Sequence, residues 1–261
     1  MKEDFIREYW DGQAVRHGAS GEASWGDEWM IRLEVETVGR RIPSGGQVLD
    51  VGCANGHATL QQRGRGAAAI TGVDYSRPMI AEALRSLAAQ PPAPGECPVE
   101  FSEADVRDLP FPDGRFDYVY TTRVLINLPT WEEQQRGIRE CLRVCRPGGC
   151  VLFSEAFWEP LMQLNALRAL RQLPALVEHD FNRYLKKDRL EAFLRGEKSP
   201  FEVDEFSSVY YLGSRFLREL VTDPAAWPGY SNPINRIFYD IEREFSGGGF
   251  GIQQAYVIRK P

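Results

Sequence analysis

Acidic side chains follow three short apolar segments that read as buried strands. Asp50 lies in the segment VLDVGCANG, two residues before Gly52, and Asp74 and Asp105 follow the next two apolar segments. Because parallel strands bind ligands at their carboxyl ends, along one edge of the sheet, the three carboxylates are predicted to lie near one another. Ionised carboxylates accept hydrogen bonds, so this edge could bind the hydroxyl, amino or ammonium groups of a ligand.

The turn after the first of these segments limits the kind of ligand. It carries Gly52 and Gly56, whereas the fingerprint of dinucleotide enzymes has glycines at its first, third and sixth positions. Asp50 is unfavourable beside a diphosphate but suits a ligand that carries an ammonium group. The next residues are His57, Ala58, Thr59 and Leu60, so the Lys-Ser or Lys-Thr pair of a phosphate loop is absent. The turn therefore predicts a zwitterionic ligand without phosphate.

The other two acids specify the rest of the ligand. Asp74 comes 18 residues after Gly56, where an acid accepts hydrogen bonds from both ribose hydroxyls and selects an unphosphorylated nucleoside. Asp105 is placed to accept from an adenine amino group, while the backbone N–H of Val106 donates to the ring. S-adenosylmethionine, an adenosine with an amino-acid tail, fits this set. Simpler roles stay open for each acid: a loop-bonding acid at Asp50, a helix cap at Asp74 and an Asx turn at Asp105.

Strands and helices alternate in the part of the chain that holds these residues. The pattern predicts strands over 47–52, 69–75, 99–104, 115–121 and 150–154, with helices over 78–89 and 131–145. This alternation is typical of a parallel sheet with crossover helices. Residues 1–40 are predicted to be a helical extension, and 157–200 two further helical stretches. The last two strands are expected at 205–212 and 254–258, with a helical segment over 214–245 between them.

Length and charge narrow the class of protein. The 261 residues suffice for one large domain, and the net charge of -6 argues against non-specific binding to nucleic acid or to an anionic membrane. No window approaches the length of a membrane span, and the charged first ten residues do not form a signal peptide. The five cysteines lack a zinc-site spacing. We expect a cytoplasmic protein with no metal and no nucleic-acid or membrane partner; its oligomeric state is not readable.

Four motifs resemble the class I S-adenosylmethionine-dependent methyltransferases, in particular the small-molecule, methyltransferase type 11-like branch. They are VLDVGCANG at 48–56, GVDYSRPM at 72–79, ADVRDLPFPDGRFDYV at 104–119 and LRVCRPGGCVLFSE at 142–155. The resemblance implies an α/β fold with a Rossmann-like seven-stranded sheet, strand order 3-2-1-4-5-7-6, flanked by helices. It divides the chain into an N-terminal helical lid (1–45), a cofactor-binding core (46–156), a helical insertion after strand 5 that forms the substrate pocket (157–204), and C-terminal strands and a helix that complete the core (205–261).

The resemblance also implies a set of residues that bind S-adenosylmethionine. They come from the lid, the glycine turn, the acidic strand ends and the exit of the fourth strand: Tyr9, Trp10, Asp50, Gly52, Cys53, Asn55, Gly56, Asp74, Tyr75, Met79, Asp105, Val106 and Thr122. For Tyr75 and Met79, an ordinary place in the hydrophobic core is the alternative.

The reaction needs little from a catalytic side chain. Methyl transfer is an in-line displacement at an activated carbon, so the protein mainly aligns the acceptor with the methyl group and excludes water. A general base is needed only for some acceptors. The candidates are His17, His179 and Asn127. Asn127 stands where the family often has histidine, which puts a base at that position in doubt, and His57 is expected to bond locally at its helix start.

The acceptor is expected to lie between the lid and the insertion. The candidate substrate-binding residues are Trp25, Arg123, Glu155, Arg183, Tyr184, Tyr211 and Arg215. Several arginines in one pocket suggest a carboxylate or phosphate on the acceptor, although each could instead be a surface residue. The sequence thus predicts methyl transfer to an O or N atom of a small polar, anionic metabolite. An RNA- or protein-modifying methyltransferase and a non-catalytic S-adenosylmethionine-binding protein remain alternatives.

Overall fold

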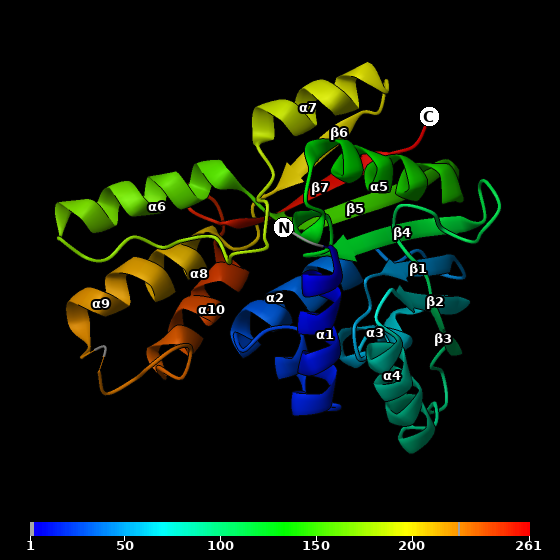
Figure 1. Ribbon diagram of the computed structural model, residues 1–261, viewed down its shortest axis with the longest axis horizontal. Coiled ribbons are helices and arrows are strands. Elements are labelled where there is room, and N and C mark those ends of the chain that lie inside the picture. The colour runs from blue at the N-terminus through cyan, green and yellow to red at the C-terminus, as the bar shows by residue number, and fades with distance from the viewer. Residues whose placement is uncertain (1–2, 224) are drawn as a thin grey trace.

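A seven-stranded mixed sheet forms the centre of the protein, as a computed structural model of residues 3–223 and 225–261 shows (Figure 1). Its order is β3-β2-β1-β4-β5-β7-β6, which confirms the order expected from the resemblance. The first five strands are parallel, and β7 runs antiparallel to both of its neighbours. The strands are β1 (Gln47–Val51), β2 (Ala69–Asp74), β3 (Val99–Glu103), β4 (Phe116–Thr122), β5 (Cys145–Ala156), β6 (Phe201–Asp204) and β7 (Gln253–Arg259).

Helices cover both faces of this sheet. In Figure 1, α5 and α7 lie on one side and α2, α3 and α4 on the other, while α6, α9 and α10 extend beyond the sheet. The helices are α1 (Glu3–His17), η1 (Gly21–Ala23), α2 (Glu28–Gly39), α3 (His57–Leu60), η2 (Arg63–Arg65), α4 (Arg77–Ala89), η3 (Leu125–Asn127), α5 (Trp131–Val144), α6 (Trp158–Leu170), α7 (Lys187–Gly196), α8 (Ser208–Leu212), η4 (Gly213–Leu217), α9 (Arg218–Val221) and α10 (Ile234–Glu244). Both helical layers contribute to one hydrophobic core.

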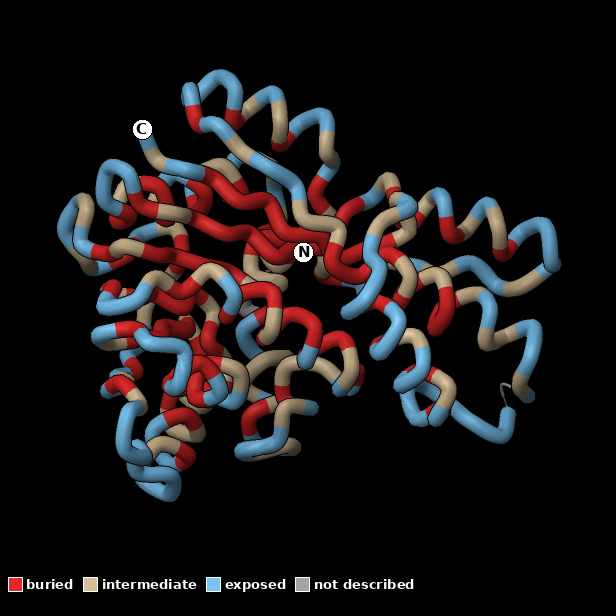
Figure 2. Tube along the Cα trace, turned by 180° about the vertical axis from the view of Figure 1, so that it is seen from behind, coloured by how far each residue is buried: buried red, intermediate tan, exposed pale blue. Residues whose placement is uncertain are grey.

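The central strands are buried along their length, as the continuous red of the sheet in Figure 2 shows. Val48, Leu49, Tyr118 and Val119 have no exposed surface. A strand covered by helices on both faces carries apolar residues at consecutive positions, which is why VLDV and DYVY lack the alternation of a half-exposed strand. These strands end at the edge where the ligand site was expected.

One predicted strand is wrong. The segment 205–212 is predicted to be a strand, but β6 is Phe201–Asp204 and Ser208–Leu212 forms α8. Glu242 accepts a hydrogen bond from the Tyr210 N–H at 2.7 Å, and Tyr210 and Tyr211 are both buried. Tertiary packing of the two tyrosines therefore outweighs their strand propensity. The strand β6 also falls inside the segment 157–204 that was expected to be purely helical.

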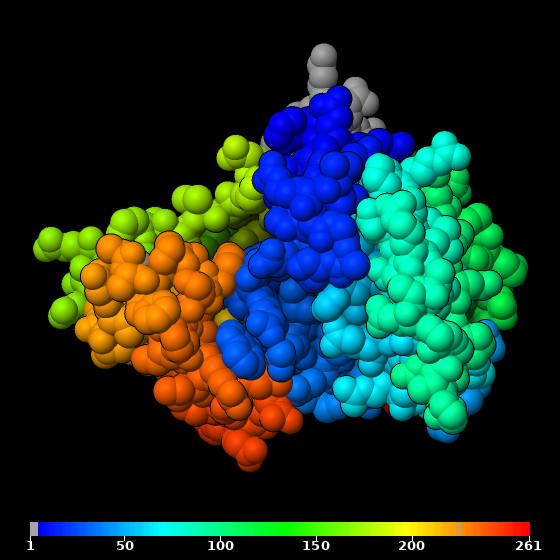
Figure 3. Space-filling view, turned by 90° about the horizontal axis from the view of Figure 1, so that it is seen from below, coloured from blue at the N-terminus to red at the C-terminus, as the bar shows by residue number. Residues whose placement is uncertain are grey.

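The N-terminal helices lie against the core beside the ends of β1 and β2. In the space-filling view of Figure 3, α1, in dark blue, lies between the yellow-green insertion and the teal surface of α4. The Ser76 hydroxyl donates to Asp11 of α1 at 2.5 Å, and the Asn55 amide donates to the carbonyls of Gly18 and Ser20 at 2.7 Å each. The extension is thus bonded to the loops that follow β1 and β2.

Candidate active site

A cavity opens at the carboxyl ends of β1, β2 and β4, beneath α1. About 860 Å³ of space, part of it open to solvent, lies within its walls, and ligand sites typically measure about 300–1,000 Å³. Its lining comes from the lid, the strand ends and the loop after β4: Ile6, Trp10, Ser24, Val51, Gly52, Ala54, Asp74, Tyr75, Met79, Ala104, Asp105, Val106, Arg107, Thr122, Arg123, Val124, Asn127, Leu128 and Pro129. We call it the main cavity.

Asp74 forms the buried acidic wall of the main cavity. One of its oxygens accepts from the backbone N–H of Ala54 at 2.9 Å and the other from that of Ser76 at 2.8 Å. These bonds tie the end of β2 to the glycine turn and fix the carboxylate in place. Burial raises the pKa of Asp74 to about 6. The cap of α4 is Ser76 and not Asp74, because the Ser76 hydroxyl accepts from the N–H of Met79.

Asp50 lies behind the glycine turn, on a second cavity. Its carboxylate accepts a hydrogen bond from the Thr59 hydroxyl at 2.6 Å, and burial raises its pKa to about 6. The second cavity also has Glu34 in its wall and shares Ser24, Gly52, Ala54, Thr122 and Arg123 with the main cavity. The two cavities therefore meet at the turn and at the exit of β4, with acids on both sides.

Asp105 lines the main cavity but is not free. Both of its oxygens bind Arg107, through the backbone N–H at 2.8 Å, Nε at 2.9 Å and Nη2 at 2.6 Å. Although burial alone would raise the pKa of Asp105, the bonds from Arg107 keep it below the usual range. Arg107 also binds Glu133 at 2.8 Å. The Asx turn, which was the alternative role for Asp105, is thus present. An ion pair with Arg107 accompanies it at the cavity wall.

The glycine turn leaves no room for a side chain at its first glycine. Gly52 has a φ of +78°, and a Cβ there would lie 2.2 Å from Cγ2 of Val124. We expect Gly52→Ala to displace the loop after β4 and to weaken ligand binding at least tenfold, because a left-handed φ and a steric overlap are combined. Gly64→Ala, where a Cβ would meet nothing within 4 Å, serves as the control. Equal ligand affinities of the two variants would contradict this expectation.

Two buried polar atoms in the lining of the main cavity have no partner among the described residues. They are the Tyr75 hydroxyl and Oδ1 of Asn127. Buried polar groups are nearly always hydrogen-bonded, so unpartnered ones in a cavity wall indicate a bound ligand or water. Together with the acidic lining and the glycine cradle, they fit a polar ligand without phosphate, such as S-adenosylmethionine.

The remaining predicted cofactor residues lie outside the lining of the main cavity. Cys53 packs in a small core cluster with Phe101, and Asn55 holds the lid through its two hydrogen bonds. A Cβ on Gly56 would meet Phe101 at 2.7 Å, so this glycine permits close packing of the turn. Tyr9 contacts the rings of Trp10 and Phe181. Cys53 and Asn55 also line the second cavity, whereas Gly56 and Tyr9 line neither cavity.

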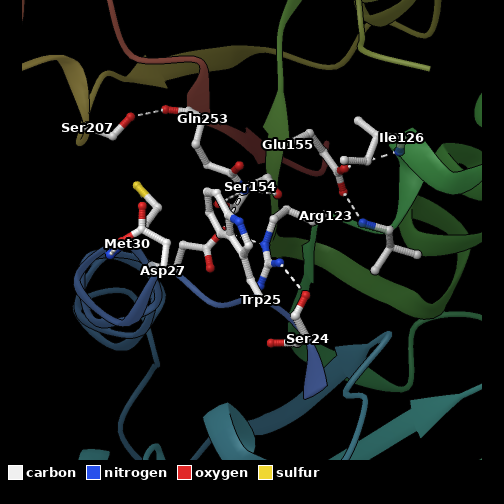
Figure 4. Close-up of polar contacts among 12 residues, drawn as sticks. Ser24, Trp25, Asp27, Met30, Arg123, Ile126, Ser154, Glu155, Ser207 and Gln253 are labelled. Carbon is white, nitrogen blue, oxygen red and sulfur yellow. Dashed lines mark hydrogen bonds and ion pairs between the residues drawn. The ribbon is translucent and has the colours of Figure 1, made fainter. Parts of the chain in front are cut away.

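Arg123 joins the loop after β4 to the lid. Its Nε binds Glu34 at 3.1 Å, Nη1 donates to the Ser24 carbonyl at 3.1 Å, and the guanidinium lies 4.8 Å from the Trp25 ring centroid. Figure 4 shows Arg123 reaching Ser24 beside Trp25. Glu34 is buried, and burial raises its pKa to about 7. Arg123 is therefore an arginine at the cavity whose charge is already paired.

The other two candidate arginines lie elsewhere. Arg215 is buried and forms an ion pair with Asp27, and its guanidinium lies 4.7 Å from the ring centroid of Tyr230 and 5.2 Å from that of Tyr211. Arg183 is exposed and donates to carbonyls of its own loop. Tyr184 is partly buried against the main core. None of these residues lines the main cavity.

Glu155 holds the loop after β4 through hydrogen bonds to its backbone. Its carboxylate accepts from the Thr121 hydroxyl at 2.7 Å and from the backbone N–H groups of Val124, Leu125 and Ile126 at 3.1–3.3 Å (Figure 4). It has no exposed surface, and burial raises its pKa to about 7. Glu155 therefore holds the loop that carries Arg123, and it does not line the main cavity.

A methyltransferase family model matches residues 48–149 and is described as a methyltransferase domain. The malonyl-[acyl-carrier protein] O-methyltransferase of Enterobacter lignolyticus is 28% identical over 68% of this chain and 65% of its own length. The 27-O-demethylrifamycin SV methyltransferase of Amycolatopsis mediterranei is 30% identical over 56% of this chain and 52% of its own length. Over this core the chain is similar to S-adenosylmethionine-dependent methyltransferases. The matches span about half to two thirds of the length of these curated relatives.

A solved structure shares the fold of this chain over its whole length. The magnesium protoporphyrin IX methyltransferase from Synechocystis PCC 6803, solved with bound S-adenosylhomocysteine, superposes with a TM-score of 0.62. The alignment covers all of both chains at 16% identity, which shows the fold alone. Within the described residues, no helix is long and apolar enough to cross a membrane, and no cluster of metal-binding side chains occurs.

The three residues predicted as catalytic candidates differ in position. Asn127 lines the main cavity, its amide donates to the Arg123 carbonyl at 2.7 Å, and its Oδ1 has no partner among the described residues. His17 lies 3.5 Å from Glu22 on the lid. His179 is exposed and packs on the rings of Tyr9 and Phe181. Neither histidine is in the cavity wall, so Asn127 is the candidate that the fold brings to the site.

Two functional-site residues escaped the sequence analysis. Glu34 lies on α2, where it accepts from Arg123 and, at 2.6 Å, from Nε2 of Gln253. Asp27 caps α2 by accepting from the N–H of Met30 and also binds Arg215. Asp27 carried a signal, because an acid before an apolar helical pattern is a common N-cap. Glu34 carried none, since its partners lie 89 and 219 residues away.

The buried acids Asp50 and Asp74 predict opposite effects of pH on ligand binding and on the free energy of unfolding. The pKa values of Asp50 and Asp74 are raised by burial from 3.8 to about 6. Cationic or hydrogen-donating ligands bind the ionised form, and at pH 5 only about a tenth of a group with a pKa of about 6 is ionised. We therefore expect calorimetry to give roughly tenfold weaker S-adenosylhomocysteine binding at about pH 5 than at about pH 8.

The unfolding free energy of the ligand-free protein is expected to change in the other direction. A raised pKa in the folded state means that these carboxyls contribute stability below their unfolded pKa, and that this stability is lost as the pH rises through about 6. Glu34 and Glu155 act in the same sense through about pH 7. Urea titrations across this range measure the change in the free energy of unfolding.

An affinity for S-adenosylhomocysteine that does not change with pH would contradict a contact between this ligand and Asp50 or Asp74.

Proposed function

We propose that the protein binds S-adenosylmethionine in the main and second cavities and transfers its methyl group to an O or N atom of a small polar metabolite. The observation that carries the proposal is the acidic, glycine-lined cavity at the ends of β1, β2 and β4. Asp74 and the unpartnered Tyr75 hydroxyl would hold the nucleoside. Asp50 and Glu34 of the second cavity would face the positively charged amino-acid tail.

When bound, S-adenosylmethionine supplies an electrophilic methyl group on a sulfonium. The residues of this chain would contribute alignment and exclusion of water. Trp10 and Ile6 of the lid cover the main cavity, and Asn127 presents Oδ1 as a hydrogen-bond acceptor. An amide oxygen can orient the hydroxyl or amino group of an acceptor but cannot take its proton at neutral pH. This arrangement favours an acceptor that needs no strong general base.

The expected anionic acceptor depends on Arg123. Of the three candidate arginines, Arg123 lines the main cavity, whereas Arg215 is paired with buried Asp27 and Arg183 is exposed. An acceptor carboxylate or phosphate would have to replace or share the Glu34 bond. Because Glu34 already balances the charge of Arg123, an uncharged polar acceptor is also compatible with the site. The two curated relatives are named for malonyl-[acyl-carrier protein] and for 27-O-demethylrifamycin SV as their substrates.

Calorimetry with S-adenosylhomocysteine and with NAD tests the cofactor. We expect S-adenosylhomocysteine to bind at least a hundredfold more tightly, because the acidic turn disfavours a diphosphate. Similar affinity for both ligands, or no binding of either, would refute the proposal. Incubation with methyl-labelled S-adenosylmethionine and a small-metabolite extract, with RNA and protein pools in parallel, then tests the acceptor class. Label in the RNA or protein pool alone would favour a macromolecular substrate. Cofactor that stays unreacted in all pools would favour a non-catalytic binding protein.

A further inference from the structure

Arg123 lies where the main cavity and the second cavity meet. The residues that line both cavities are Ser24, Gly52, Ala54, Thr122 and Arg123, and of these Arg123 carries a charge. The sulfur of S-adenosylmethionine links the nucleoside to the amino-acid tail, and the proposed function places the nucleoside in the main cavity and the tail in the second. The sulfonium and its methyl group would therefore lie beside Arg123.

The backbone of Arg123 is held in a conformation that side chains other than glycine rarely adopt. Its φ is +59°, in the left-handed region. Its N–H donates to the Ser154 carbonyl at 2.8 Å, and its carbonyl accepts from the Asn127 amide at 2.7 Å. Strained backbone of this kind persists where the surrounding contacts fix it, and it is concentrated at functional sites. The loop after β4 thus fixes a guanidinium at the junction of the cavities.

A cation at this junction would disfavour the methyl donor. S-adenosylmethionine carries a positive charge on its sulfur, whereas S-adenosylhomocysteine, which remains after the methyl group is transferred, has a neutral sulfur. The side chains of Arg123 and Glu34 are only 16% and 4% exposed, and charges in such surroundings are screened much less than charges in water. An unbalanced guanidinium would therefore make the site prefer the spent product to the methyl donor.

We infer that Glu34 is a specificity-determining residue that balances the charge of Arg123 and so lets the site accept the cationic methyl donor. Glu34 accepts from Nε of Arg123 at 3.1 Å, and the same oxygen accepts from Nε2 of Gln253 at 2.6 Å. The other contacts of the guanidinium, the Ser24 carbonyl and the Trp25 ring, are uncharged. Glu34 and Arg123 both line the second cavity, so they face it as a pair without net charge.

The inference rests on the proposed function for the placement of the cofactor, and a ratio of two dissociation constants tests it. The ratio of S-adenosylmethionine to S-adenosylhomocysteine isolates the charge on sulfur, because the adenosine and the tail are common to both ligands. Calorimetry of the full chain at about pH 8, where Glu34 with its pKa of about 7 is ionised, gives both constants.

Glu34→Gln should raise this ratio about tenfold, because the amide keeps an acceptor oxygen for Arg123 and Gln253 but leaves the guanidinium unbalanced. Adding Arg123→Gln removes the remaining charge and should return the ratio to that of the parent chain. Glu28→Gln and Arg32→Gln are the matched controls, since they neutralise an exposed ion pair of the same helix that lines neither cavity. Both should keep the parent ratio.

Arg123→Gln alone keeps the inference testable if circular dichroism shows that Glu34→Gln does not fold. It leaves no positive charge at the junction, so the ratio should stay at the parent value or fall. The inference is overturned if a folded Glu34→Gln has the parent ratio, if the double variant keeps a raised ratio, or if Arg123→Gln raises it. In these cases both ligands still bind and the proposed function stands. A parent chain that binds neither ligand would refute the proposed function and the inference with it.

Discussion

Asp74→Ala is expected to weaken S-adenosylhomocysteine binding by about 2–3 kcal/mol, or roughly 30- to 150-fold. The carboxylate lines the main cavity, and its removal would delete a charged hydrogen-bond acceptor for the ribose hydroxyls. It would also leave the N–H groups of Ala54 and Ser76 without their partner, so the glycine turn would lose its anchor to β2. Both effects act on the same ligand. Isothermal calorimetry at about pH 8, where the acid is ionised, measures the loss.

Two further variants separate the contact from general charge effects. Asp74→Asn keeps the shape and one acceptor oxygen, so its loss of affinity should be smaller than that of alanine. Glu103→Ala removes the acid that pairs in register with Asp74 on β3 but is exposed and outside the cavity. It should bind S-adenosylhomocysteine like the parent chain. Unchanged affinity in Asp74→Ala would remove the proposed role of this residue.

Asp27→Ala is expected to lower the free energy of unfolding by about 3–5 kcal/mol, because it leaves the buried Arg215 charge unpaired. Asp27 has no exposed surface, accepts from the Tyr210 hydroxyl at 2.5 Å and caps α2 through the N–H of Met30. It therefore connects the lid to α8 and η4. Urea denaturation followed by circular dichroism measures the change.

A double variant distinguishes the ion pair from simple packing. Asp27→Ala combined with Arg215→Met removes both charges, so its cost should be clearly less than the sum of the two single changes. Glu28→Ala, on an exposed neighbour of Asp27 that pairs with Arg32, should change the unfolding free energy by less than about 0.5 kcal/mol. Additive costs in the double variant would show that the two charges do not stabilise each other.

The parallel core was predictable because its signals are local. Apolar segments, glycine turns and proline-containing loops each fall within a few residues, and the order of β1 to β5 follows from the family motifs. Asp74 and Asp105 were placed on the same grounds, since a strand end fixes the position of the residue that follows it. The strand predicted over 205–212 was wrong, because the local sequence carries no information about how Tyr210 and Tyr211 pack in the folded protein.

The polar contacts of the acceptor side were not predictable from spacing. Arg123 meets Glu34 across 89 residues, and Arg215 meets Asp27 across 188. The sequence showed arginines that could bind an anion, but it could not show that buried acids from the lid already bind two of them. Such pairings depend on how the N-terminal extension packs on the completed sheet, which no local pattern encodes.

The hydrogen bonds from Asn55 to Gly18 and Ser20 join the segment that follows α1 to the glycine turn after β1. The main cavity is partly open to solvent, and these two bonds set how far the N-terminal segment narrows that opening. Under the proposed function, a chain that lacks the Asn55 amide would hold this segment less firmly and would release the spent cofactor sooner.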